Sequence, residues 1–430
     1  MKKSQKVMKI LKNNKSKDKF KIFRPFFIIF GLLFLSNPFI GIVDILPNFI
    51  GYFFLIFGLD GIKRLNGDIE YGVKNLKYLC GISALFFVLM FYTFKMDSSW
   101  ILTLTFSYMA INIIFGTIAC NGILNGIDYC TDRHGSDNFP SVYETKLMTK
   151  IYIWVKAALS VIPQLYALVE VEASSSLSVD IDYASILATK KYAIAVCILL
   201  SIGIAIAWLK YVVNYTLALK KDEKLMSSLT KAYVTDFSKN GIPINFFALN
   251  FGSGLILISH IFLYDFVLDT VHFFPEFISV LMSRVGIFIL RKYLNCKGLS
   301  KYAIFSFLFQ IAIFFYRNKF IENVIFELGD ITFFHLIISS VLTLGYIIFT
   351  FLYFSKVHEI TSESYEEMFG CKSTEIYEWG DIFLFIALAA GGANIICSVW
   401  RPYFVAIMIV SLFAAMYHFT KIYTRFENKY

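Results

Sequence analysis

A single arginine inside a predicted membrane helix is the residue of this chain most suited to chemistry. Arg284 lies nine residues after Pro275 and seven before Arg291, which mark the two ends of an apolar stretch. At about 1.5 Å per residue, Arg284 is about 13 Å from one end and about 10 Å from the other. A charge at that depth costs at least about 2.5 kcal/mol and usually faces a polar interior. The alternative is that its long side chain extends to the cytoplasmic surface beside Arg291.

Three amide side chains in other apolar stretches could join Arg284 in a binding site. They are Asn112, Gln164 and Asn394. Amides in membrane helices often bond to a neighbouring helix, and this is the alternative for each of them. Together with a cation they would suit an anionic solute or a lipid headgroup. We therefore take Arg284, Gln164, Asn394 and Asn112 as the candidate ligand-binding residues.

The acidic and metal-binding residues give a negative prediction. No Asp or Glu falls at the centre of a predicted span, although proton-coupled carriers commonly place a carboxylate there. His358 and Glu359 do not begin an H-E-x-x-H pattern, because Ser362 stands at the second His position, and they are predicted to lie in an acidic cytoplasmic segment. Lys156, six residues inside its span, is expected to extend to the surface. We expect no metal site, no cofactor and no catalytic residue, and leave open whether the protein is an enzyme.

Membrane-spanning helices are the elements that must position these side chains. The 430 residues are 57% hydrophobic and 17% charged, and their mean hydropathy is +0.64, outside the range of soluble proteins. An α-helix needs about 20 apolar residues to cross the hydrocarbon. An all-α integral membrane protein with about 12 transmembrane helices is predicted, at residues 25–43, 45–62, 77–94, 100–122, 151–170, 192–213, 245–263, 273–290, 302–316, 331–354, 382–399 and 402–419.

The positive charges predict the orientation of these helices. Of the 40 Lys and Arg residues, 32 fall in segments on one predicted side of the membrane, and only six fall in loops on the other. Because cytoplasmic loops carry the excess of positive charge, both termini are predicted to be cytoplasmic. The same bias explains the net charge of +9, so no nucleic-acid partner is needed. The predicted location is the cytoplasmic (plasma) membrane of a bacterium.

The chain is predicted to consist of two similar halves. When residue 47 is laid on residue 275 without a gap, Pro47 matches Pro275 and Gly58 matches Gly286. Six spans per half give both copies the same orientation, so the two halves are parallel and related by an axis along the membrane normal. The predicted domains are a basic cytoplasmic tail at 1–24, a first six-helix half at 25–213, a cytoplasmic linker at 214–244 and a second six-helix half at 245–425.

Two resemblances concern the start of the first half. The box Asp44-Ile45-Leu46-Pro47-Asn48-Phe49-Ile50-Gly51-Tyr52 resembles a segment of uncharacterised multipass membrane proteins of Firmicutes, over some twenty residues and with no activity implied. The six-plus-six plan is similar to that of major-facilitator carriers, whose Gly, Asp and basic signature would fall where this chain has Gly58, Asp60 and Arg64. The spacing departs from that pattern, and Phe288 replaces the acid in the second half, so only the architecture is analogous.

Three functions are compatible with the sequence. The first is a transporter or permease for a small anionic or amphipathic solute, which the two-half plan and the intramembrane cation favour. The second is a non-catalytic sensor, immunity or scaffold protein that binds a cytoplasmic protein partner, which the lack of intramembrane carboxylates favours. The third is a membrane enzyme that acts on a lipid-linked substrate. It is favoured only by the loop at 128–137, whose side chains could bind a metal ion. All three require the lipid bilayer as a partner.

Overall fold

The computed structural model describes residues 22–40, 43–44, 46–93, 98–135, 141–166, 168–169, 183–237, 246–263, 266–268, 271–291, 298–320, 333–369, 374–396 and 401–427. Helices dominate these residues, which confirms the helical prediction. The contacts divide the chain into two compact units, one within residues 19–244 and the other within residues 245–430. Nearly all of the predicted basic tail, residues 1–21, lies outside the described residues.

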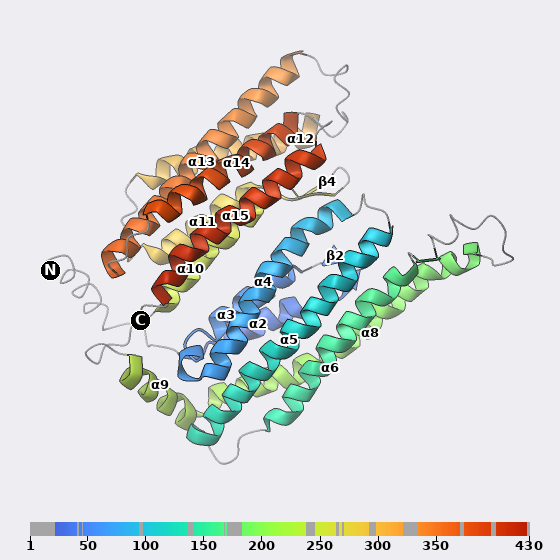
Figure 1. Cartoon of the computed structure of the whole chain (residues 1–430), viewed down its shortest axis with the longest axis vertical. Coiled ribbons are helices and arrows are strands. Elements are labelled where there is room, and N and C mark those ends of the chain that lie inside the picture. The colour runs from blue at the N-terminus through green and yellow to red at the C-terminus, as the bar shows by residue number, and fades with distance from the viewer. Residues whose placement is uncertain are drawn as a thin grey trace. The chain divides into compact units, whose positions relative to one another are not determined.

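The first unit begins with two short helices joined by a β-hairpin (Figure 1). Strands β1 and β2 are antiparallel, with Phe39 opposite Asp44 and Ile40 opposite Val43. Four longer helices follow, and the last leads into the amphipathic helix α9, which packs across the ends of α5 and α8. In order, the elements are α2 (Pro25–Leu35), β1 (Phe39–Ile40), β2 (Val43–Asp44), α3 (Asn48–Gly58), η2 (Lys63–Leu65), α4 (Gly67–Thr93), α5 (Ser98–His134), α6 (Val142–Val161), η3 (Ile162–Leu165), α8 (Tyr183–Lys221) and α9 (Glu223–Phe237).

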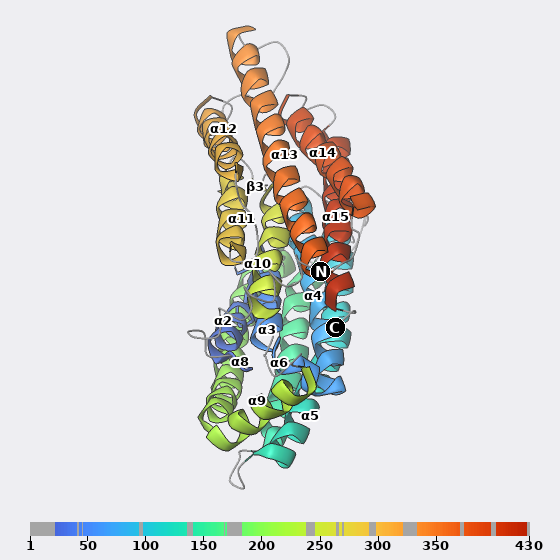
Figure 2. The ribbon, with the colours of Figure 1, turned by 90° about the vertical axis from the view of Figure 1, so that its left-hand side faces the viewer.

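The second unit has the same order of elements: two short helices around a β-hairpin, then four longer helices (Figure 2). Its hairpin is antiparallel, with Leu268 opposite Val271. This shared order agrees with two similar halves, while the internal repeat itself stays a prediction. In order, the elements are α10 (Phe246–Ser259), η4 (His260–Leu263), β3 (Phe266–Leu268), β4 (Val271–Phe274), α11 (Phe277–Leu290), α12 (Leu299–Phe320), α13 (Phe333–Phe369), α14 (Thr374–Ile396) and α15 (Arg401–Glu427).

Six helices in the described part of the chain are long and apolar enough to cross a membrane, judged by length and composition. They belong to α4, α5 and α8 in the first unit and to α12, α13 and α15 in the second. The apolar segment of α13 extends to Glu363, so it includes His358, which the sequence analysis placed in a cytoplasmic segment. Similarly, α14 begins at Thr374, seven residues before Asp381, whereas its predicted span began only at residue 382.

The helices at the predicted spans 25–43 and 45–62 are shorter than expected. Helices α2 and α3 contain 11 residues each, which gives a length of about 16 Å, against about 30 Å of hydrocarbon. Helix α2 ends at Leu35 because Pro38 cannot continue a helix, and Asn37 Nδ2 donates to Leu46 O at 2.6 Å, which ties the two ends of the connection together. Helix α3 starts directly after Pro47.

The connection between α2 and α3 lies among the longer helices of the first unit. Asn48 Nδ2 donates to the hydroxyl of Tyr108 at 3.5 Å, and the rings of Phe49 and Phe87 are 5.4 Å apart. Tyr108 is ten residues, or about 15 Å, inside the start of α5, and Phe87 is about 9 Å inside the end of α4. Helix α2 therefore ends in the interior of the bundle.

Glycines allow these two short helices to approach closely. A Cβ atom on Gly31 would lie 2.7 Å from Gly51 O, and one on Gly51 would lie 2.7 Å from Leu35 Cγ. The second unit repeats this feature, because a Cβ atom on Gly286 would lie 2.6 Å from Gly252 O. Small residues at helix contacts are the usual means of close packing in membrane proteins.

A buried ion pair lies at the other end of the α2–α3 hairpin. Lys63 Nζ is 2.7 Å from Asp60 Oδ1, and both side chains are less than a tenth exposed. The guanidinium of Arg24 and the hydroxyl of Tyr233 on α9 belong to the same electrostatic environment. Burial lowers the pKa of Arg24, which Asp60 opposes, and burial also raises the pKa of Tyr233. Helix α9 thus covers the charged end of the hairpin.

Candidate functional site

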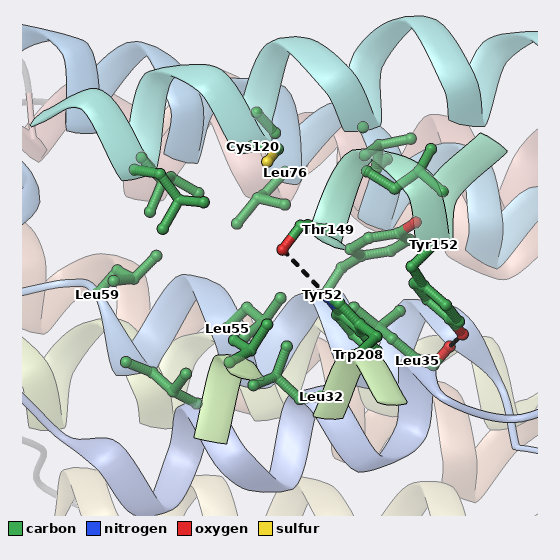
Figure 3. A pocket seen from close by; sticks show the side chains of 18 of the residues that line it. Leu32, Leu35, Tyr52, Leu55, Leu59, Leu76, Cys120, Thr149, Tyr152 and Trp208 are labelled. Carbon is green, nitrogen blue, oxygen red and sulfur yellow. Dashed lines mark hydrogen bonds between the residues drawn. The ribbon is translucent and has the colours of Figure 1, made fainter. Parts of the chain in front are cut away.

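A cavity of about 170 Å³ lies inside the first unit, surrounded by α2, α3, α4, α5, α6 and α8 (Figure 3). Its wall is mainly leucine and other apolar side chains, including Leu32, Leu55 and Leu76. The rings of Tyr52, Tyr152 and Trp208 gather at one side, while Leu59 lies at the opposite side. An engineered apolar cavity of about 150 Å³ binds benzene, so this volume is sufficient for a small ring or a short chain.

Lys156 and Tyr152 of α6 both bond to the end of α2. The Lys156 ammonium and the Tyr152 hydroxyl each donate to Leu35 O at 2.6 Å. The last carbonyls of a helix have no partner within that helix and carry partial negative charge, so a buried cation stabilises them. Lys156 is only 9% exposed, and the expectation that it extends to the surface is wrong, because a buried helix end binds its ammonium.

Helical spacing places the polar side chains of α6 on one face. Thr149, Tyr152 and Lys156 are separated by three and four residues, which aligns them along one side of a helix. The Tyr152 ring is stacked on Trp208 of α8, with centroids 4.0 Å apart and planes within 3°. Trp208 Nε1 donates to Thr149 Oγ1 at 3.1 Å, which fixes the indole ring (Figure 3). The polar wall of the cavity is thereby held rigidly by two helices.

Asn112 of α5, one of the candidate ligand-binding residues predicted from the sequence, lines the same cavity. Its Oδ1 accepts from the Tyr52 hydroxyl at 3.0 Å, and its Nδ2 donates to Tyr108 O at 2.8 Å. Both ends of the amide therefore bond to protein groups. Asn112 joins α3 to α5 at the edge of the cavity, which is the interhelical role given as its alternative, and its role in ligand binding stays a prediction.

Two other predicted site residues, Arg284 and Gln164, are not among the residues that line this cavity. Arg284 lies on α11 in the second unit, is partly buried, and has Nη2 3.5 Å from Ser300 Oγ. Gln164 is a partly buried residue of η3. The side chain of Asn394 lies outside the described residues. The described structure does not bring Arg284 or Gln164 into one site with Asn112.

The cavity has one charged group among its described lining residues, and that group is Lys156. An apolar wall with one ammonium suits a ligand that has a compact apolar body and a single negative charge. The sequence contained a signal for this wall, namely the spacing of Thr149, Tyr152 and Lys156. It contained no signal for Leu35, since only the fold shows that α2 ends beside α6.

No family model matches this chain, and neither a curated protein nor a solved structure matches it. The function must therefore be argued from the geometry of the site.

Proposed function

We propose that this chain is a multipass protein of the bacterial plasma membrane, with both termini cytoplasmic, whose first unit binds a small amphipathic anion for transport. The observation that supports binding is the buried Lys156 ammonium, which is the one charged group among the described lining residues of a mainly apolar cavity. Apolar walls with a few fixed polar groups are typical of small-molecule sites. The six long apolar helices support the membrane location, and the 32 to six charge bias supports the orientation.

In this proposal α2 and α3 form a hairpin that enters and leaves the membrane on the cytoplasmic side. Their length of about 16 Å is too short for a crossing, and their connection lies among the longer helices. The basic residues that flank the hairpin, Arg24 and Lys63, then lie on one side, as the charge bias requires. The short helices α10 and α11 are proposed to behave in the same way. This arrangement needs fewer than the twelve crossings predicted from the sequence.

The end of α2 supplies a mechanism that links ligand binding to a change in the protein. Discontinuous helices form the binding sites of many transporters, and one repeat or bundle moves against the other around such a site. A carboxylate that enters the cavity attracts the Lys156 ammonium, which bonds to Leu35 O in this structure. Transfer of the ammonium from the carbonyl to the ligand loosens the end of α2, so ligand binding changes the hairpin.

The binding experiment uses three ligands of equal size and different charge: benzoate, benzyl alcohol and benzylammonium. Calorimetry with the purified full-length protein should show benzoate binding most tightly and benzylammonium most weakly. Lys156→Met should weaken benzoate at least about tenfold, equivalent to about 1.4 kcal/mol, and leave benzyl alcohol unchanged. Unchanged binding of the neutral ligand also reports that the variant is folded.

Arg284→Leu provides a matched control, because it removes a cation that does not line this cavity. Benzoate affinity should be the same as in the unmodified protein. Equal benzoate binding in Lys156→Met would reject the proposed site, and loss of binding in Arg284→Leu would instead favour the residue first selected from the sequence. Uptake of radiolabelled benzoate into proteoliposomes then separates transport from binding alone, since a sensor would bind without uptake.

A further inference from the structure

Two histidines are enclosed in the second unit, in a region that the proposed solute site does not use. His260 of η4 is 0% exposed and His358 of α13 is 2% exposed. Their rings are stacked, with centroids 5.0 Å apart and planes inclined by 18°. The ring of Phe419 of α15 stacks on His358, and the ring centroid of Phe354 lies 4.7 Å from that of His260. Aromatic side chains from α13 and α15 thus shield both imidazoles.

A carboxylate and a serine complete the network. His358 Nδ1 lies 3.2 Å from Asp381 Oδ1 on α14, and Ser355 Oγ donates to Asp381 Oδ2. On the other ring, His260 Nδ1 lies 2.8 Å from Ile256 O. Because a carbonyl can only accept, the hydrogen of neutral His260 is on Nδ1. The same reasoning puts the hydrogen of His358 on the nitrogen that faces the ionised carboxylate.

With the hydrogen of each ring on Nδ1, the Nε2 atom of each ring is a buried hydrogen-bond acceptor. Nε2 of His260 and Nε2 of His358 have no hydrogen-bond partner among the described residues. Buried polar atoms without partners are costly, and native proteins contain few of them. Both belong to ionisable rings in helices of the apolar second unit, where ionisable groups usually serve a function.

Neither a catalytic triad nor a metal site fits this geometry. A Ser-His-Asp triad needs the hydroxyl bonded to the imidazole, whereas Ser355 bonds to the carboxylate. A metal ion needs nitrogens that converge at about 2.0–2.1 Å, whereas the lone pairs of two nearly parallel rings 5.0 Å apart do not converge. No cluster of three metal-binding side chains occurs among the residues that the structure describes.

We propose that the His260–His358–Asp381 network is a proton-binding site of the second unit, independent of solute binding. A hydronium ion gives its proton to Nε2 of His358, which produces water and an imidazolium that Asp381 stabilises. No electron is transferred. The site accepts one proton, because a second cation on His260, only 5.0 Å away, is strongly unfavourable in a protein interior.

The groups that face His358 agree with this assignment. Among the described residues, η4 contributes His260, α14 contributes Asp381, and α15 contributes the uncharged ring of Phe419. On α13 itself, Tyr353 is turned to Ser283 of α11, to which its hydroxyl donates at 3.1 Å. The Lys356–Glu359 ion pair is on the outward face, with side chains more than a third exposed. Asp381 therefore provides the one carboxylate near the ring within the described part of the chain.

Protonation should also change the arrangement of the two rings. The new N–H of His358 has no described acceptor in the stacked geometry, and the Nε2 lone pair of His260 is an acceptor that a stacked ring cannot reach. An N–H···N bond requires the rings to meet edge to edge, which moves η4 relative to α13. Asp381 is the more exposed member of the pair, with 12% of its side chain exposed against 1% for His358.

The experiment is a nitrogen-15 NMR titration of the full-length protein, labelled at its six histidines and held in lipid nanodiscs. His358 should change from a neutral to a protonated ring on acidification, and the His260 signals should move at the same pH. His335, which bonds to the Tyr316 hydroxyl at 2.9 Å, serves as a histidine outside the network. It should not share the transition.

Two variants test the roles of the partners. Asp381→Asn preserves shape but removes the charge, and His358 should then stay neutral over the pH range in which the protein is folded. In His260→Asn, His358 should still become protonated on acidification, but the rearrangement that brings the two rings edge to edge should be lost. The proposal is rejected if His358 of the unmodified protein stays neutral throughout, or if Asp381→Asn titrates as before. Thermal unfolding of each variant checks that it is folded.

Discussion

Lys156 and Leu35 are 121 residues apart in the chain and are joined by a 2.6 Å hydrogen bond from the ammonium to the carbonyl at the end of α2. Tyr152 donates to the same oxygen. Because one carbonyl has two buried donors, substituting each donor alone and then both together measures what each hydrogen bond contributes to stability.

The first prediction is that the losses in the free energy of unfolding caused by removing the two donors are not additive. Lys156→Met or Tyr152→Phe leaves Leu35 O one partner, so each should lower the free energy of unfolding by about 1 kcal/mol. The double variant leaves the buried carbonyl with neither donor and should lose more than the two single losses together, by about 1–3 kcal/mol. Unfolding in mixed micelles measures all four proteins. Additive losses would mean that water or another group replaces the missing donors.

The second prediction concerns the contact between α2 and α3. Gly51→Ala places a methyl group 2.7 Å from Leu35 Cγ and should destabilise the protein by about 1–3 kcal/mol. Gly81 of α4 is a matched control, because a Cβ atom there has no neighbour within 4 Å. Gly81→Ala should be neutral or stabilise by about 1 kcal/mol, through helix propensity alone. Thermal unfolding compares the two, and equal effects would show that the helices are not in close contact.

The third prediction tests the re-entrant hairpin with an impermeant thiol reagent in intact cells. Leu46, 40% exposed, lies in the connection from α2 to α3, and the twelve-span topology places it at the outer end of the span at 45–62. A re-entrant hairpin keeps it within the membrane, so Leu46→Cys should not react. Lys191→Cys, on the predicted outer side, should react, and Lys224→Cys in the cytoplasmic linker should react only after the cells are opened. Labelling of Leu46→Cys at the Lys191→Cys rate would establish that α2 and its connection cross the membrane.

The fourth prediction concerns the ion pair at the base of the hairpin. Asp60→Asn removes the carboxylate that lies 2.7 Å from the buried Lys63 ammonium and should cost about 3–5 kcal/mol. Replacing both residues, as in Asp60→Leu with Lys63→Met, should cost less than Asp60→Asn alone, since no uncompensated charge is left. Chemical unfolding of the variants measures the difference. A double variant less stable than Asp60→Asn would show that the charges also serve Arg24 or Arg64.

Much of the helical content could be predicted from the sequence, because long apolar runs such as the one in α8 leave few alternatives in lipid. The ends of α2 and α3 could not, because hydropathy does not distinguish an 11-residue helix followed by a β-hairpin from one continuous span. Lys156 was misassigned for a related reason: sequence depth suggests that a lysine can reach the surface, and only the fold places a buried carbonyl beside it.

The His358–Asp381 pair was also hidden from the sequence. The two residues are 23 positions apart on different helices, and each lies close to a predicted span end. The apolar segment of α13 extends farther than expected, and α14 begins earlier, so both side chains become interior residues. Arg284 shows the converse: its depth was predicted from the flanking residues, but depth alone did not indicate which partner it would have.

The order of synthesis gives the half-length helix α2 a particular difficulty during biogenesis. Its 11 apolar residues are too few to insert stably as an independent segment. Its donors on α6 are synthesised more than a hundred residues later. We therefore expect the end of α2 to reach its final position only after α6 has been synthesised.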